Sequence, residues 1–324
     1  MASCLNFSLS EYQGRKLHKS FEERGLESRM ISISNGSTIH CWVPKDFTPP
    51  VGNSSNANGN TVTAKSEKPL LVLLHGFGLS SVWQWSSQVK PLVRYFDLIM
   101  PDLLFFGRST TTNPDRSESF QAECVWLVLS KLGISRFSVV GTSYGGFVAY
   151  RLTQAHPDAV DKLVISNSST CMTPEDDQEL CKRGGAATIP ELLLPTTRPG
   201  LEAVGKLVFC KPAPTWFIPS FIINDYLKVL YLPNREEKVE LLKHLAFGKE
   251  AGPALLTKVD KEVLIIWGEA DNVFPVEQAE RIKEYLGERA ELVVLKEAGH
   301  VSQMEQPAKW NSLVVKFLLG IELA

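Results

Sequence analysis

The alternation of apolar segments is the feature that most restricts the fold of this 324-residue chain. From residue 70 onward, short and mainly apolar runs alternate with longer stretches whose apolar residues recur at helical spacing. Such runs are typical of strands buried on both faces, and the helices between them connect parallel strands. The predicted strands are Leu70–Leu74, Phe96–Met100, Phe137–Val140, Lys162–Ile165, Val263–Trp267 and Leu292–Leu295. The predicted helices are Ser80–Tyr95, Ser117–Leu132, Tyr144–His156, Val276–Leu286 and Val301–Leu319.

Two further strands are indicated near the N-terminus. Met30–Ser34 alternates apolar and polar residues, an Asn-Gly turn signal comes next, and Thr38–Val43 follows it. With these two strands, we predict an α/β fold on a mostly parallel, eight-stranded sheet flanked by helices. Residues 49–68 are rich in Pro, Gly, Asn, Ser and Thr, and we expect a flexible loop there. Tyr12–Leu26 mixes apolar and charged residues, which indicates a short helix docked on the domain or, as a weaker option, a peripheral membrane contact.

The strand and helix alternation is interrupted between residues 169 and 253. This segment has helical spacing and many aromatic residues but no comparable buried strands. We expect a helical cap inserted before the last strands, with residues 1–168 and 254–324 forming the core. Open α/β sheets bind ligands at the carboxyl edge of their strands, where we expect the cap to lie. Most of its aromatic residues should form the cap's own small core, and a minority should face the pocket. The pocket candidates are Trp83 of the core and Trp216, Phe217, Phe221 and Tyr226 of the cap.

Composition and charge narrow the range of partners. The formal net charge is −2, so no basic footprint for nucleic acid or for an anionic membrane is visible. No apolar run reaches the roughly 20 residues of a membrane span. The N-terminus lacks a basic segment followed by a long apolar run, and the six scattered cysteines form no metal-ligand or C-x-x-C pattern. These features predict a cytoplasmic protein with reduced thiols and no integral membrane segment.

A G-x-S-x-G motif is the first candidate for chemistry. Gly141-Thr142-Ser143-Tyr144-Gly145 stands at the end of a predicted strand and directly before a predicted helix. That context is the one a nucleophile elbow needs, because a sharp turn exposes the serine hydroxyl at the edge of the sheet. A serine hydroxyl is a weak nucleophile unless it is paired with a base. Ser143 is therefore the candidate nucleophile, and it requires partners elsewhere in the chain.

A glycine-rich turn after an earlier strand is the candidate oxyanion site. His75-Gly76-Phe77-Gly78 follows a buried strand and precedes a predicted helix. Such a turn can present a backbone N–H to the oxygen that becomes negative when the serine attacks. We expect the N–H groups of Phe77 and Tyr144 to be these donors. The ring of His75 is expected to brace the turn rather than to react.

Two late segments can supply the acid and the base. A buried strand runs into Gly268-Glu269-Ala270-Asp271, and Asp271 is our candidate to orient a histidine, with Glu269 as its competitor. His300 lies on a loop after the last predicted strand, from which it can reach the serine. The resulting chain order of serine, aspartate and histidine is the order of one superfamily of triad enzymes.

Taken in order, these motifs resemble those of the α/β-hydrolase superfamily, from about residue 70 to the C-terminus. The match comprises the His-Gly-Phe-Gly turn, the elbow, Asp271 and the Gly-His pair that ends at His300. Asp102–Ser109 also resembles the family's D-L-x-G-x-G-x-S loop, with Phe105 in place of the first glycine. This departure is expected to alter the floor of the pocket but not the chemistry.

Within that superfamily, the chain is similar to plant serine hydrolases in the neighbourhood of monoacylglycerol lipases, bacterial C–C bond hydrolases and epoxide hydrolases. Trp83-Gln84-Trp85 and Pro114–Phe120 fit this plant subgroup. Epoxide hydrolases of the superfamily use an aspartate as nucleophile. The serine at position 143 therefore argues against epoxide chemistry.

The motifs and the resemblance together imply a serine hydrolase that cleaves a small hydrophobic or aromatic carboxylic ester through an acyl-enzyme. A slow-turnover receptor built on a hydrolase is one alternative, and a C–C bond hydrolase or lyase that uses the same triad is another. Water and side chains suffice for this chemistry, so no cofactor and no metal are expected. The expected partner is a small hydrophobic ester rather than nucleic acid, and the chain is expected to act as a monomer or homodimer.

Overall fold

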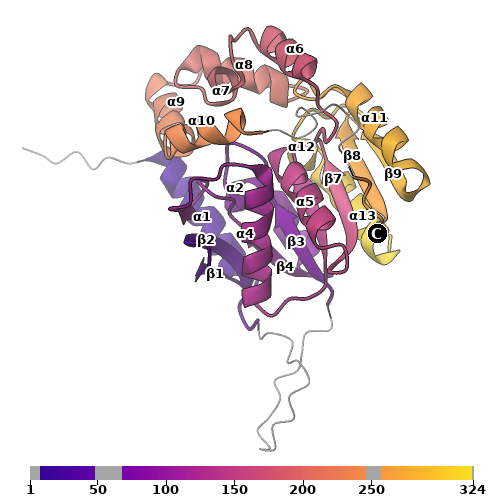
Figure 1. The fold of residues 1–324 in the computed structure, drawn as a ribbon. Helices are drawn as coiled ribbons and strands as arrows, with labels where there is room; N and C mark the ends of the chain where they lie inside the picture. The colour runs from indigo at the N-terminus through magenta and orange to yellow at the C-terminus, as the bar shows by residue number, and fades with distance from the viewer. Residues whose placement is uncertain (1–7, 48–67, 246–256, 323–324) are drawn as a thin grey trace, which may run out of the picture.

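A twisted sheet of nine strands organises the described part of the chain (Figure 1). The computed structural model describes residues 8–47, 68–245 and 257–322, so the loop predicted for residues 49–68 lies outside them except for Lys68. The sheet order is β1-β2-β4-β3-β6-β7-β8-β9, with the short β5 paired to β2. The strands are β1 (Leu26–Ser32), β2 (Ser37–Pro44), β3 (Leu70–Leu74), β4 (Asp97–Pro101), β5 (Thr110–Thr111), β6 (Phe137–Thr142), β7 (Val160–Ser166), β8 (Val263–Gly268) and β9 (Ala290–Leu295).

The predicted α/β fold is confirmed. The pairs from β4 through β3, β6, β7 and β8 to β9 are all parallel, whereas β1, β2 and β5 pair antiparallel. The first two strands form the hairpin expected from the Asn-Gly signal, and Gly36 in its turn has a φ of +82°. The ninth strand, β5, was not predicted because two threonines are too short to produce a periodic pattern.

Helices cover both faces of the sheet and produce two hydrophobic layers. In β3, Val72 and Leu74 pack into one layer while Leu71 and Leu73 pack into the other, because successive side chains of a strand point to opposite faces. The first layer is closed by α4 (Glu118–Lys131), α5 (Tyr144–Ala155) and α11 (Val276–Leu286). The second is closed by α1 (Leu9–Glu22), α2 (Ser81–Gln84), α3 (Ser86–Leu92) and α13 (Pro307–Leu319). Two short elements, η3 (Gly287–Arg289) and α12 (Ser302–Glu305), complete the C-terminal part.

A group of helices between β7 and β8 lies at one end of the sheet (Figure 1). We call it the cap, and it consists of α6 (Pro174–Gly184), α7 (Ile189–Leu193), α8 (Arg198–Val208), α9 (Ser220–Tyr226), the π-helical turn η1 (Leu227–Tyr231) and α10 (Arg235–Lys243). A threonine caps the start of three of these helices. Thr173, Thr188 and Thr197 each accept a hydrogen bond from the backbone N–H three residues later, and a proline follows within two residues. Threonine at the N-cap and proline in the first turn define the helix starts.

The N-terminal helix connects the cap to the core. The backbone N–H and the hydroxyl of Ser10 in α1 donate to Asp225 Oδ2 in α9, at 2.8 and 2.7 Å. The opposite end of α1 buries Phe21 against Trp42 of the sheet, with ring centroids 5.1 Å apart. This arrangement agrees with the docked helix expected for residues 12–26. Across the described ranges, the structure contains no helix with the length and apolar character of a bilayer span.

Candidate active site

Ser143 stands on a strained turn between β6 and α5. Its φ is +50° and its ψ is −123°, a combination that non-glycine residues rarely adopt and that tends to persist at functional sites. Neighbouring glycines make this turn possible. A Cβ at Gly141 would collide with the carbonyl oxygen of Gly145, and a Cβ at Gly145 would collide with that of Leu74. The sequence motif therefore produces the elbow through close backbone contacts rather than through flexibility.

The structure brings Ser143, His300 and Asp271 together. His300 Nε2 lies 2.8 Å from Ser143 Oγ, and His300 Nδ1 lies 2.9 Å from Asp271 Oδ2. Because a carboxylate accepts hydrogen bonds only, Nδ1 carries a proton and Nε2 is left to accept the serine proton. These contacts join the ends of three strands, since Ser143 follows β6, Asp271 follows β8 and His300 follows β9.

Asp271 is the buried acid and Glu269 is not. Asp271 is only 4% exposed, and its Oδ1 accepts hydrogen bonds from the backbone N–H groups of Val273 and Phe274 at 2.8 and 2.9 Å. Glu269 is exposed, and its backbone N–H bonds to Leu295 O. Of the two candidate acids, Asp271 is therefore the one that is buried in contact with His300.

Asn167 is a member of this cluster that the sequence reasoning missed. Its Nδ2 donates to Asp271 Oδ2 at 2.8 Å, and its Oδ1 accepts from the hydroxyl of Ser302 at 2.6 Å. The residue follows β7, is fully buried and has a φ of +47°, which asparagine tolerates better than most residues do. One sequence signal was available: Asn167 is a polar residue that follows a buried strand, as Ser143 and Asp271 also do.

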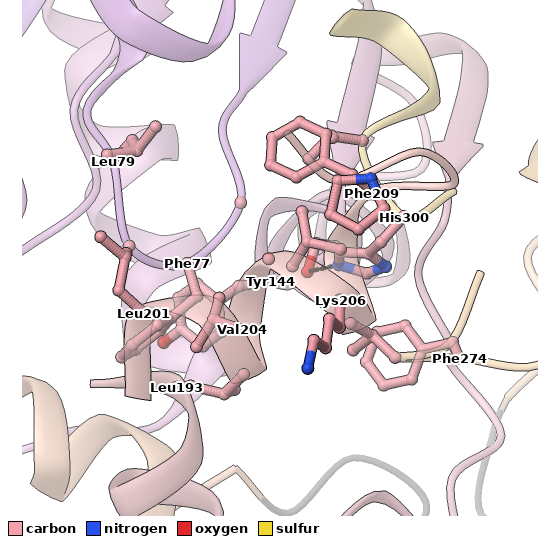
Figure 2. A pocket seen from close by; sticks show the side chains of 18 of the residues that line it. Phe77, Leu79, Tyr144, Leu193, Leu201, Val204, Lys206, Phe209, Phe274 and His300 are labelled. Atoms are coloured by element: carbon pink, nitrogen blue, oxygen red, sulfur yellow. Dashed lines mark hydrogen bonds between the residues drawn. The ribbon is translucent and has the colours of Figure 1, made fainter. Parts of the chain in front are cut away.

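The two expected oxyanion donors lie at the same cavity. Phe77 and Tyr144 both line this cavity (Figure 2). Ser143 lines the same cavity. Within the described residues, neither backbone N–H donates to a protein acceptor. His75 braces the turn as expected, because its Nδ1 donates to Gly76 O at 2.8 Å while its Nε2 accepts from Leu103 N–H at 2.9 Å. Burial lowers the pKa of His75, in keeping with a neutral ring that serves as both donor and acceptor.

A cavity of about 560 Å³ lies between the elbow and the cap. Its walls are mainly apolar, and its cap side includes α8 and the chain that follows α8. Figure 2 shows the Lys206 side chain and its amino group among these apolar groups. The labelled side chains are Phe77, Leu79, Tyr144, Leu193, Leu201, Val204, Lys206, Phe209, Phe274 and His300.

Only one of the five aromatic residues expected in the pocket lines this cavity. It is Trp216, which is also 83% exposed and therefore stands at the rim. Phe217 and Phe221 are 59% and 72% exposed and point to solvent, so periodicity and composition misplaced them. The hydroxyl of Tyr226 donates to Gln13 of α1 instead. Trp83 packs against the second layer and lies over Gly14 of α1.

Phe105 also lies away from the cavity, contrary to the expectation that it alters the pocket floor. It adopts a φ of +71°, which explains why a glycine would suit this position in the loop. The ring is 5% exposed and is covered by the Arg116 guanidinium, 4.6 Å from its centroid. In the described part of the chain, no group of three His, Cys, Asp or Glu residues is arranged to hold a metal ion.

Comparison with known proteins identifies the family to which this fold belongs. The family model described as the alpha/beta hydrolase fold matches residues 69–307, which is most of the chain. The chain belongs to this family.

Named relatives within the family differ in their chemistry. The chain is 27% identical over 285 residues to epoxide hydrolase 4 of Homo sapiens, covering 78% of this chain and 72% of that protein. It is 28% identical over 263 residues to the 2-hydroxy-6-oxononadienedioate/2-hydroxy-6-oxononatrienedioate hydrolase of Pseudomonas sp., covering 77% and 87%. Among solved structures, a bacterial membrane phospholipase A superimposes with a TM-score of 0.74 at 20% identity, covering 97% and 93%, a likeness that shows the fold alone.

Proposed function

We propose that this protein is a serine hydrolase that cleaves a small hydrophobic or aromatic carboxylic ester. The observation that carries the proposal is the position of the His300 ring between Ser143 Oγ and Asp271 Oδ2, at 2.8 and 2.9 Å. A base held in this tautomer can remove the serine proton as the hydroxyl attacks. The apolar cavity in front of Ser143 favours an acyl or aryl group over a charged substrate.

The reaction proceeds through an acyl-enzyme. Ser143 Oγ attacks the ester carbonyl while His300 Nε2 takes its proton, and the amides of Phe77 and Tyr144 stabilise the negative oxygen. His300 then returns the proton to the leaving alcohol, whose bond to the carbonyl carbon breaks. Water activated by His300 releases the acid and restores the serine.

Steady-state hydrolysis of 4-nitrophenyl esters of increasing acyl length tests this proposal. The wild-type protein should turn over many times, and a fluorophosphonate should label Ser143. The Ser143→Ala variant should lose both activities while it still binds a non-hydrolysable ester analogue. A burst of one product equivalent followed by a near-stop would favour the receptor alternative instead.

A carbon–carbon bond hydrolase is the second candidate function. Two observations favour it: the 28% identity to the Pseudomonas dienedioate hydrolase, and Lys206, whose ammonium group could pair with a substrate carboxylate at the cavity. Turnover of an acidic dienedioate at a rate well above that of neutral aryl esters, and a loss of that preference in Lys206→Met, would support this candidate.

A further inference from the structure

The peptide between Gly76 and Phe77 is held by a side chain that the proposed mechanism does not yet use. Gln84, in the short helix α2, accepts a hydrogen bond from Gly76 N–H at 2.8 Å through Oε1. Its Nε2 donates to the carbonyl oxygen of the same residue at 3.0 Å. Gln84 is 6% exposed and lines the cavity, so these bonds form where water competes little.

The carbonyl of Gly76 is therefore bound from two sides. It accepts one hydrogen bond from Gln84 Nε2 and a second from His75 Nδ1 at 2.8 Å. In a trans peptide, the N–H of the next residue points away from the carbonyl oxygen. Fixing the Gly76 carbonyl on the side of Gln84 and His75 thus fixes the Phe77 N–H on the opposite side.

The turn that carries this N–H lies beside the nucleophile. A Cβ at Gly76 would lie 2.9 Å from Ser143 Cβ, so this turn lies directly against the elbow. Gly76, Phe77 and Ser143 also line one cavity. The position of Gln84 is itself secured, because Asp102 Oδ1 accepts hydrogen bonds from Ser81 N–H and Ser81 Oγ at the start of α2.

We propose that Gln84 is a positioning residue that orients the Phe77 N–H toward the oxyanion formed at Ser143. This inference rests on the proposed function, since it assigns Gln84 a part in the same acyl-transfer site. Preoriented donors stabilise a developing charge without reorganising during the reaction, so a turn that can rotate loses this benefit. The effect of Gln84 therefore falls on the transition state rather than on substrate binding.

Replacing Gln84 with methionine tests this assignment, because methionine keeps the length of the side chain and removes both hydrogen-bonding groups. We expect kcat for a 4-nitrophenyl ester to fall about 10- to 100-fold with KM nearly unchanged. The affinity for a trifluoromethyl ketone, which forms an oxyanion on the serine, should fall by the same factor. Unchanged kcat and ketone affinity would overturn the proposal.

Gln278→Met is the control. Gln278 in α11 is also buried, at 4% exposure, and it does not line the cavity. Both variants should unfold at similar temperatures, and only Gln84→Met should lose activity. Equal activity losses in both variants would mean that Gln84 acts through stability alone.

The rate of fluorophosphonate labelling separates this proposal from the proposed ester function. Labelling needs an activated Ser143 and oxyanion donors but no particular substrate. If the wild-type protein hydrolyses no ester but is labelled, only the ester assignment fails, and slower labelling of Gln84→Met still supports the positioning role. A wild-type protein that is neither labelled nor active would overturn both.

Discussion

Asn167 Nδ2 lies 2.8 Å from Asp271 Oδ2, the same carboxylate oxygen that contacts His300. Asn167 and His300 therefore bind the same oxygen of Asp271. The bond from Asn167 fixes the orientation of the Asp271 carboxylate relative to the His300 ring. The orientation of Asn167 is itself set by the hydroxyl of Ser302, which donates to Oδ1. Asn167 and Ser302 thus help to orient the Asp271 carboxylate that contacts His300.

Asn167→Asp should disturb catalysis more than it disturbs the fold. Aspartate has the same shape and tolerates the positive φ, but it places a second negative charge beside Asp271 and His300. The added charge favours the protonated, inactive form of His300. We expect the acidic limb of the pH–rate profile to move to higher pH and kcat/KM at pH 7 to fall about tenfold or more, roughly 1.4 kcal/mol. A pH–rate profile measured beside Asn311→Asp, another buried asparagine, checks this; identical profiles for both variants would contradict it.

Asp271→Asn should abolish most of the activity while the structure is kept. The asparagine amide can donate a hydrogen bond to His300 Nδ1, which stabilises the tautomer with its proton on Nε2. In that tautomer, Nε2 cannot accept the proton of the Ser143 hydroxyl. We expect kcat to fall about 10³- to 10⁴-fold. Glu269→Gln, which changes an exposed acid two residues away, should retain wild-type kcat in the same assay. A larger loss of kcat in Glu269→Gln than in Asp271→Asn would instead assign the role of the acid to Glu269.

Gly145→Ala should destabilise the protein strongly. The added Cβ would collide with the carbonyl oxygens of Leu74 and His75, and backbone at this point cannot move without separating β3 from the elbow. We expect the free energy of unfolding to fall by about 3 kcal/mol or more, as for overpacked cores. Gly205→Ala in α8 is the control, because its Cβ meets nothing within 4 Å; it should stabilise the helix by about 0.5–1 kcal/mol. Urea denaturation of the two variants distinguishes these outcomes, and a mild effect at Gly145 would contradict the close contact.

Lys238→Met should stabilise the protein at neutral pH. Lys238 in α10 is 3% exposed, lies 5.1 Å from the Phe106 ring centroid and, within the described residues, has no acidic partner. Burial lowers its pKa to about 8, so the folded protein releases this proton before the unfolded chain does. The stability of the wild-type protein should therefore rise as pH increases from about 8 to about 10.5, the ordinary range for lysine.

The variant lacks this titration. Its advantage should be on the order of 3 kcal/mol below pH 8 and should disappear only above about pH 10.5, where the lysine is neutral in both the folded and the unfolded chain. Unfolding free energies from urea titrations between pH 7 and 10 measure the difference. Lys243→Met, on the exposed side of α10, should show none of this dependence. A difference that stays constant with pH would contradict the titration of Lys238.

The sequence predicted those parts of the molecule that depend on local pattern. A strand buried on both faces must be continuously apolar, so β3, β6 and β8 were visible as runs, and Ser143, Asp271 and His300 were visible because they follow such runs. Asn167 and Gln84 were not predicted. Asn167 contacts Asp271, which lies far away in the chain, and Gln84 contacts Gly76 across a turn. These contacts form only in the folded protein, so neither residue stands out in the sequence.

The pocket was the least predictable part. Aromatic residues were abundant between positions 169 and 253, but composition does not determine which face of a helix they occupy. Phe221 points to solvent, whereas Leu201 and Val204 of α8 line the cavity. Which residues line the cavity therefore depends on how the cap helices are rotated over the sheet, and a local sequence pattern does not reveal this rotation.

The contact between Ser143 and His300 has a consequence for how this protein matures. The two residues are 157 positions apart, and the cap is synthesised between them. A nascent chain that has released only its first 250 residues can form the elbow but holds no base to activate it. Contacts of such large sequence separation form late because closing the intervening loop costs entropy. Reactivity at Ser143 should therefore appear only when synthesis and folding are nearly complete, which makes it an indicator of a fully assembled domain and limits unwanted acylation of partly folded chains.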